Sequence, residues 1–229
     1  MKKTARALML LGVLLFTGPP GHAQTFNRRF DFFDNGQTQT AFDVEVLSDS
    51  TYAVILGSAE EDSLGPNLYF SYYSIGLINI DRNGTRTYQQ RFVYPEHGIL
   101  PGWSNCCDTL GGGGFIVGGT VGDTLGNLHI DLIAFDQLGD SIWTQEYAPG
   151  EENWNCQQVK NTLDGGIIMA GNKSWGNTTE GFVIKTDGTG NMQWVRNYNH
   201  PGGISIGSIS PVADGGFLLG GGALDGSNG

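Results

Sequence analysis

The residues of this sequence that could do chemistry are few and dispersed. The three cysteines, Cys106, Cys107 and Cys156, show no C-x-x-C or cysteine–histidine spacing of the kind that holds a metal. The chain also contains no G-x-S-x-G, H-E-x-x-H or phosphate-binding glycine loop. We therefore predict no catalytic residue, no metal site and no cofactor.

The N-terminus has the pattern of a secretory signal peptide. Three basic residues, Lys2, Lys3 and Arg6, precede an apolar run at 7–16, and a small-residue cleavage site ends at Ala23. This run is too short to cross a bilayer, which takes ~20 apolar residues. We predict a signal peptide at 1–23, a mature domain at 24–229, and a protein that is secreted or held on the cell surface and does not span the membrane.

The composition narrows the class of partner. The chain has 229 residues, of which 37 are glycine and only 15% are charged, and its formal net charge is −11. Its 11% aromatic residues argue against disorder. Acidic surfaces repel phosphate backbones and anionic lipids, so nucleic acid is disfavoured as a partner. Binding of a cation or a sugar remains open, and the expected partner is an extracellular protein or a glycan.

An internal repeat is the main signal in the sequence. Asp81, Asp136 and Asp187 each follow an apolar run and begin a D-x-x-G turn, and an aromatic residue follows four positions after the glycine. The aromatic residue is Trp143 in the second copy and Trp194 in the third. The copies recur about every 50 residues, a period typical of propellers and other repeat architectures. Asp and Gly at these positions predict tight hairpin turns.

A second motif recurs in register with the first. The segments 113–119, 165–171 and 215–221 each read Gly-Gly followed by an apolar strand, and 51–57 is a weaker copy. Each unit then divides into four strands, which in the second unit are expected at 103–108, 115–120, 130–135 and 141–147. No segment shows a sustained helical period, so little helix is expected.

Four antiparallel strands per unit of this length predict a β-propeller blade. The predicted fold is therefore all-β, a partial β-propeller with three full blades and a broken fourth. The blades are expected at about 42–97, 103–150, 154–202 and 204–229. Trp143 and Trp194 are interpreted as wedges between blades, and a β-sandwich or a solenoid is the competing fold. The segment 26–30 resembles a fourth strand, whereas the last unit ends after its second strand, so we expect a piece of a longer chain.

These motifs resemble the β-propeller-like repeat proteins that Gram-negative bacteria export by type IX secretion. The resemblance rests on the D-G-G turns at 164–167 and 214–217, the D-x-x-G-x-x-x-W hairpins, and the predicted cleavage junction. It implies a secreted or surface location and offers no catalytic residues to carry over. We expect a non-enzymatic binding or adhesion scaffold.

The alternative is a fragment of an enzyme whose catalytic residues lie elsewhere. The D-x-x-G-x-x-x-W hairpin also resembles the tryptophan-docking repeat of quinoprotein dehydrogenases, some of which carry a vicinal disulfide, here Cys106-Cys107, although the spacing is one residue short. A glycan-active propeller is the other alternative, but the sialidase-type Asp-box fails to match around Asp187. Trp175, in a loop expected at 172–181, is the candidate for stacking on a sugar. A plainer interpretation pairs Cys106 or Cys107 with Cys156 in a disulfide.

Overall fold

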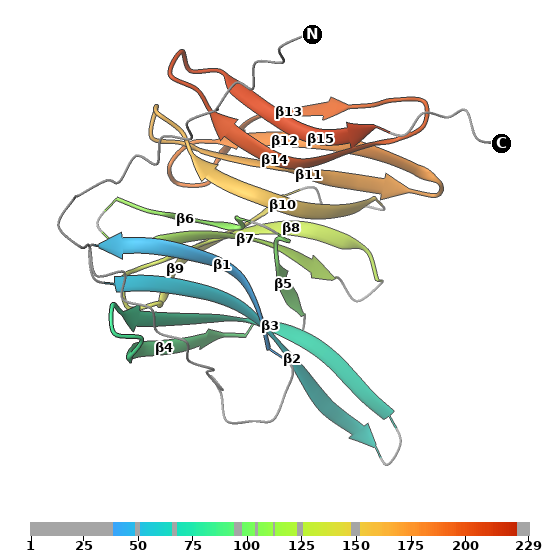
Figure 1. Ribbon diagram of the computed structural model, residues 1–229. Helices are drawn as coiled ribbons and strands as arrows, with labels where there is room; N and C mark the ends of the chain where they lie inside the picture. The colour runs from blue at the N-terminus through green and yellow to red at the C-terminus, as the bar shows by residue number, and fades with distance from the viewer. Residues whose placement is uncertain are drawn as a thin grey trace, which may run out of the picture.

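The computed structural model describes residues 39–48, 51–65, 68–93, 98–103, 105–111, 113–122, 126–147 and 152–223. The predicted signal peptide and the strand expected at 26–30 lie outside these residues. Within them the chain forms 15 strands in four antiparallel sheets and no helix, which confirms the all-β prediction (Figure 1). Accordingly, the described part offers no helix that could cross a membrane.

In sheets 1, 3 and 4, strands that follow one another along the chain pair with one another, whereas in sheet 2 the first two strands both pair with the third. Sheet 1 consists of β1 (Gln39–Ser48), β2 (Thr51–Gly65), β3 (Leu68–Asp81) and β4 (Arg86–Phe92). Sheet 2 consists of β5 (Ile99–Pro101), β6 (Cys107–Thr109), β7 (Phe115–Gly122), β8 (Leu128–Phe135) and β9 (Ser141–Tyr147). Sheet 3 consists of β10 (Asn153–Asn161), β11 (Ile167–Trp175), β12 (Thr178–Thr186) and β13 (Met192–Tyr198). Sheet 4 consists of β14 (Ile204–Pro211) and β15 (Phe217–Ala223).

The first strand of sheet 2 departs from the prediction of one strand at 103–108. Both β5 and β6 pair with β7, and the chain loops out between them. The Gly118 amide donates to the carbonyl of Cys106 at 2.8 Å, and the Gly118 carbonyl accepts from Gly102 at 3.0 Å. Gly118 of β7 thus forms one hydrogen bond with a residue on each side of the loop. Its backbone amide and carbonyl therefore both stay paired where the loop leaves the sheet. Asn105 takes a positive φ of 48° there, and Trp103 is 60% exposed.

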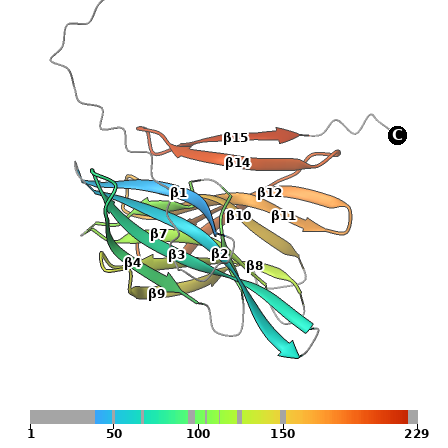
Figure 2. The same ribbon diagram turned by 60° about the horizontal axis from the view of Figure 1, so that its bottom comes forward.

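The sheets pack on one another in chain order, and the apolar core lies between them. Both views show the β14–β15 pair lying over sheet 3 (Figures 1 and 2). Buried residues that fill the gaps include Ile55, Leu77, Val117 and Ile133 between sheets 1 and 2, Leu132, Met169 and Phe182 between sheets 2 and 3, and Ile168, Val183, Ile206 and Ile209 between sheets 3 and 4. Burial of each such side chain contributes roughly 1.5–3 kcal/mol. Stability therefore depends on neighbouring sheets covering one another.

The two repeated motifs form turns at one end of the sheets. In all three D-x-x-G turns, Asp Oδ1 accepts hydrogen bonds from the amides two and four residues later, at 2.7–3.0 Å. The turn glycines Gly84, Gly139 and Gly190 have φ of 75°, 75° and 87°, which side chains other than glycine adopt at a cost. We call this end, which also carries the Gly-Gly turns, the turn end. The opposite end, with the β7–β8 and β11–β12 hairpins and the connections between sheets, is the hairpin end.

Candidate functional site

In the first two units the repeated aromatic residue lies against the turn glycine of the next sheet. A Cβ atom placed on Gly190 would lie 2.8 Å from Cζ3 of Trp143, and one on Gly139 would lie 3.2 Å from Cε1 of Tyr88. Trp194 meets Phe217 of sheet 4, with ring centroids 6.1 Å apart. The structure thus brings Trp143 and Trp194 to the boundaries between sheets, and it places Asp81, Asp136 and Asp187 in the turns themselves. These residues serve the stacking of sheets.

The first strands of successive sheets are joined by hydrogen bonds at one equivalent position. The backbone amide there donates to a group presented by the preceding sheet. The pairs are Cys107 N to Asp43 Oδ2 at 2.9 Å, Val159 N to Asn105 O at 3.1 Å, and Ile209 N to Gln158 Oε1 at 2.6 Å. Asp43 and Gln158 lie at bulges of their strands, where an extra residue can turn a polar group away from its own sheet, and Asn105 lies in the loop between β5 and β6.

The three cysteines are buried and are free thiols in this structure. Burial raises the pKa of Cys106 and Cys107 well above that of an ordinary thiol, and it raises the pKa of Cys156 to about 12. Cys106 and Cys156 come near each other, since a Cβ on Gly102 would lie 3.0 Å from both Cys106 Cβ and the Cys156 carbonyl. Thiols of raised pKa are poor nucleophiles at neutral pH. The predicted disulfide between Cys156 and one of the other two stays a prediction.

Trp175, the candidate for ligand stacking, lies at the hairpin end of sheet 3. It is 39% exposed, and the Lys173 ammonium lies 5.1 Å from its ring centroid and 5.0 Å from that of Trp154. The strand register explains the stack, because Trp154 lies directly opposite Lys173, and Trp175 follows Lys173 by two positions on the same face. Glu180 lies opposite Lys173 on the third strand.

Two carboxylates hold the lysine between the rings. Lys173 Nζ lies 3.2 Å from Glu152 and 3.5 Å from Glu180, and its side chain is only 8% exposed. A cation between aromatic faces contributes about 0.5–2 kcal/mol per ring. The arrangement holds Trp175 in a fixed orientation beside two carboxylates. An aromatic face next to groups that accept hydrogen bonds can bind a polyhydroxylated or amine-bearing ligand.

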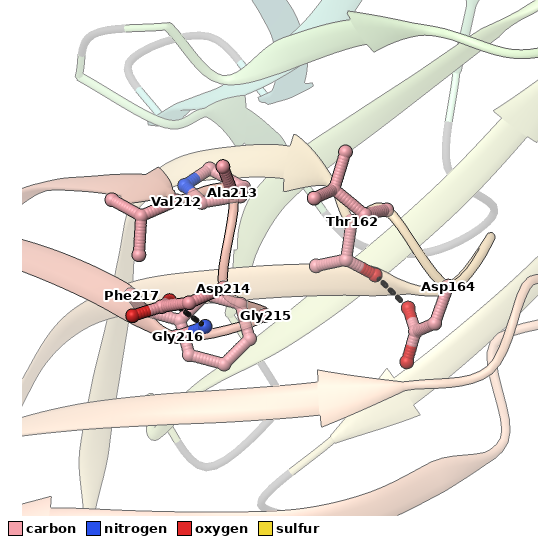
Figure 3. A pocket seen from close by; sticks show the side chains of 10 residues that line it. Thr162, Asp164, Val212, Ala213, Asp214, Gly215, Gly216 and Phe217 are labelled. Atoms are coloured by element: carbon pink, nitrogen blue, oxygen red, sulfur yellow. Dashed lines mark hydrogen bonds between the residues drawn. The ribbon is translucent and has the colours of Figure 1, made fainter.

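A hollow lies at the turn end, between the Gly-Gly turns of sheets 3 and 4 (Figure 3). Its volume is about 340 Å³, and residues 162–164 and 211–217 line it. The Thr162 hydroxyl donates to Asp164, the Gly166 amide donates to the same oxygen, and Lys185 lies 3.1 Å away, which together lower the pKa of Asp164 to about 2. Asp214 accepts from the Gly216 amide at 2.8 Å. The carboxylates of this hollow are therefore engaged by their own turns.

Among the residues that the structure describes, one cluster that the sequence did not predict could hold a metal. His129 and Asp131 on β8 and Glu146 on β9 bring one ligand atom each within 4.8 Å of the others. The two-residue spacing of His129 and Asp131 is visible in the sequence, but the pairing of Asp131 with Glu146 requires the strand register. This cluster is separate from Trp175.

Comparisons with known proteins give no family. No family model matches the chain, and a search of curated proteins finds no match. The class that the structure defines is an all-β protein of successive antiparallel sheets, and function has to be argued from its own residues.

Proposed function

We propose that the four sheets are successive blades of a β-propeller and that the chain is an exported binding scaffold. It would engage an extracellular protein or glycan through the loops of its hairpin end. The resemblance to proteins exported by type IX secretion and the predicted signal peptide at 1–23 support a secreted or cell-surface location in a Gram-negative bacterium.

The observation that carries the proposal is how the sheets touch. The first strands of neighbouring sheets lie against one another, with β1 beside β6, β6 beside β10 and β10 beside β14. Within the described residues, the fourth strands β4, β9 and β13 make no comparable contact with one another. Sheets that meet along their first strands and separate toward their fourth strands fan out from a common axis, as propeller blades do. A flat sandwich would instead face two sheets along their whole width.

The turn end and the hairpin end differ in what they offer a ligand. At the turn end, Asp81, Asp136 and Asp187 accept the amides of their own turns. At the hairpin end, Trp175 presents a partly exposed ring next to Glu152 and Glu180. Aromatic residues that combine a large apolar face with little conformational freedom are frequent contributors to binding energy. We therefore assign binding to the hairpin end.

Export is tested by expressing the full chain with a C-terminal epitope tag in a Gram-negative host. The proposal predicts the tag outside the cytoplasm on a protein whose N-terminus is Gln24. Leu11→Arg, which interrupts the apolar run of the signal peptide, is the matched control and should keep the tag in the cytoplasm. A wild-type protein that stays in the cytoplasm with Met1 intact would contradict the proposal.

Binding is tested on the exported protein with an array of bacterial and host polysaccharides and extracellular proteins. We expect at least one probe to bind and Trp175→Ala to weaken that binding at least tenfold. Leu163→Ala changes a residue that is 75% exposed at the turn end and should leave binding unchanged. Equal binding by the wild type and Trp175→Ala would contradict the assignment of the binding site to the hairpin end.

A further inference from the structure

Three side chains with metal-binding groups share one face of sheet 2. His129 and Asp131 are two positions apart on β8, so they lie on the same face, and Glu146 lies directly opposite Asp131 on β9. Ile133 continues the same alternation and packs in the core between sheets 1 and 2. The three polar side chains therefore sit at the hairpin end of an otherwise apolar face.

The distances between their atoms suit one small cation. His129 Nε2 lies 3.5 Å from Asp131 Oδ1 and 3.9 Å from Glu146 Oε2, and one ligand atom of each residue lies within 4.8 Å of the others. A tetrahedral Zn²⁺ with bonds of ~2.0–2.2 Å keeps its ligand atoms ~3.3–3.5 Å apart. Small side-chain rotations would bring the three atoms to that spacing.

Asp131 occupies the position that a core phenylalanine, Phe182, holds in sheet 3. In sheet 2 the row of paired residues reads Gly119, Asp131, Glu146, and the matching row of sheet 3 reads Gly171, Phe182, Asn197. Phe182 and Asp131 are both completely buried. A buried carboxylate lowers stability unless hydrogen bonds or a cation compensate it. Such a break in a local pattern is typical of a functional position.

Solvent can reach this cluster from one side. The side chain of His129 is 12% exposed and that of Glu146 is 47% exposed, whereas that of Asp131 is fully buried. The cluster therefore has a closed inner side and an open outer side. Three protein ligands with one open position form the arrangement in which a metal can still bind water or another ligand.

We propose that His129, Asp131 and Glu146 bind a divalent transition-metal cation of the Zn²⁺ type. His129 would coordinate through Nε2, and each carboxylate would coordinate through one oxygen. An imidazole together with two carboxylates favours Zn²⁺ or Mn²⁺ over Ca²⁺, which takes six to eight oxygen ligands. The competing arrangement is a metal-free contact between His129 and Asp131.

The test is calorimetric titration of the purified full chain, freed of metal by a chelator, with ZnCl₂, MnCl₂ and CaCl₂ in turn. We expect one Zn²⁺ per chain, weaker binding of Ca²⁺, and a Zn²⁺-dependent rise in Tm. Glu146→Gln should weaken Zn²⁺ binding at least tenfold and fold normally, since Glu146 is half exposed. His129→Gln should weaken it similarly, whereas His200→Gln, which changes an exposed histidine, should not.

A second readout reports the ligands themselves. Co²⁺ bound to a nitrogen and two carboxylate oxygens in a four-coordinate site gives visible absorption bands that aqueous Co²⁺ lacks in intensity. These bands should appear with the wild type and with His200→Gln and should be lost with His129→Gln. The proposal is overturned if Zn²⁺ does not bind, or if Glu146→Gln and His129→Gln bind it as tightly as the wild type, which would mean that the metal sits on other surface acids.

Discussion

Replacing Gly190 by alanine tests how neighbouring sheets fit together. The new Cβ would lie 2.8 Å from Cζ3 and 3.0 Å from Cη2 of Trp143, and 3.3 Å from the Tyr147 hydroxyl. Gly190 also has a φ of +87°, a conformation that alanine adopts at a cost of about 1–2 kcal/mol. Overpacking against the indole adds about 1–3 kcal/mol. We expect Gly190→Ala to lower the free energy of unfolding by about 2–5 kcal/mol.

Gly165→Ala is the matched control in the same sheet. Gly165 has a φ of +78°, and nothing lies within 4 Å of a Cβ placed on it. Its replacement should therefore cost only the conformational part, about 1–2 kcal/mol. Trp143→Phe removes the part of the indole that the new methyl group meets, so it should recover part of the loss in the Gly190→Ala background.

Urea unfolding is measured for the wild type, Gly190→Ala, Trp143→Phe and the double variant, which form a double-mutant cycle, and for Gly165→Ala as the control. A coupling energy of about 0.5–3 kcal/mol between Gly190 and Trp143 is expected for residues in contact. Equal losses for Gly190→Ala and Gly165→Ala, with no coupling to Trp143, would refute the packing of Trp143 against the next sheet.

Three further predictions follow from single groups. Hydrogen bonds from Asn191 and Thr189 lower the pKa of Asp187 to about 2. The ionised carboxylate therefore stabilises the fold above about pH 4, the usual Asp pKa, and this stabilisation is lost as the pH falls toward 2. The difference in Tm between the wild type and Asp187→Asn should shrink over that range. Gln158→Leu leaves the buried Ile209 amide unpaired and should lower the free energy of unfolding by about 1–3 kcal/mol, whereas exposed Gln145→Leu should not. Iodoacetamide should label none of the three cysteines in the native protein and all three in urea; a single labelled thiol in urea would instead support the predicted disulfide.

Local turn chemistry was the predictable part of this fold. An Asp that can bond its own backbone and a Gly that tolerates positive φ specify the hairpin wherever they occur, and the three D-x-x-G copies adopt the same geometry. The alternation of apolar residues predicted the strands on either side. The all-β class follows from these two signals.

Features that depend on the exact register between paired strands were not predictable. The break between β5 and β6 depends on Gly118, which bonds residues on both sides of the loop, and spacing along 103–108 does not reveal it. Likewise, the stack of Trp154, Lys173 and Trp175 depends on the β10–β11 register. The cluster at His129 was missed for the same reason, since Glu146 lies opposite Asp131 only in the particular register of the β8–β9 hairpin.

The most direct test of sheet-on-sheet stacking is a nuclear Overhauser measurement on isotope-labelled protein. The account predicts cross-peaks between the indole protons of Trp143 and the Hα protons of Gly190, and between the ring protons of Tyr88 and the Hα protons of Gly139. Ring protons of Trp143 that show cross-peaks only within sheet 2 would contradict it.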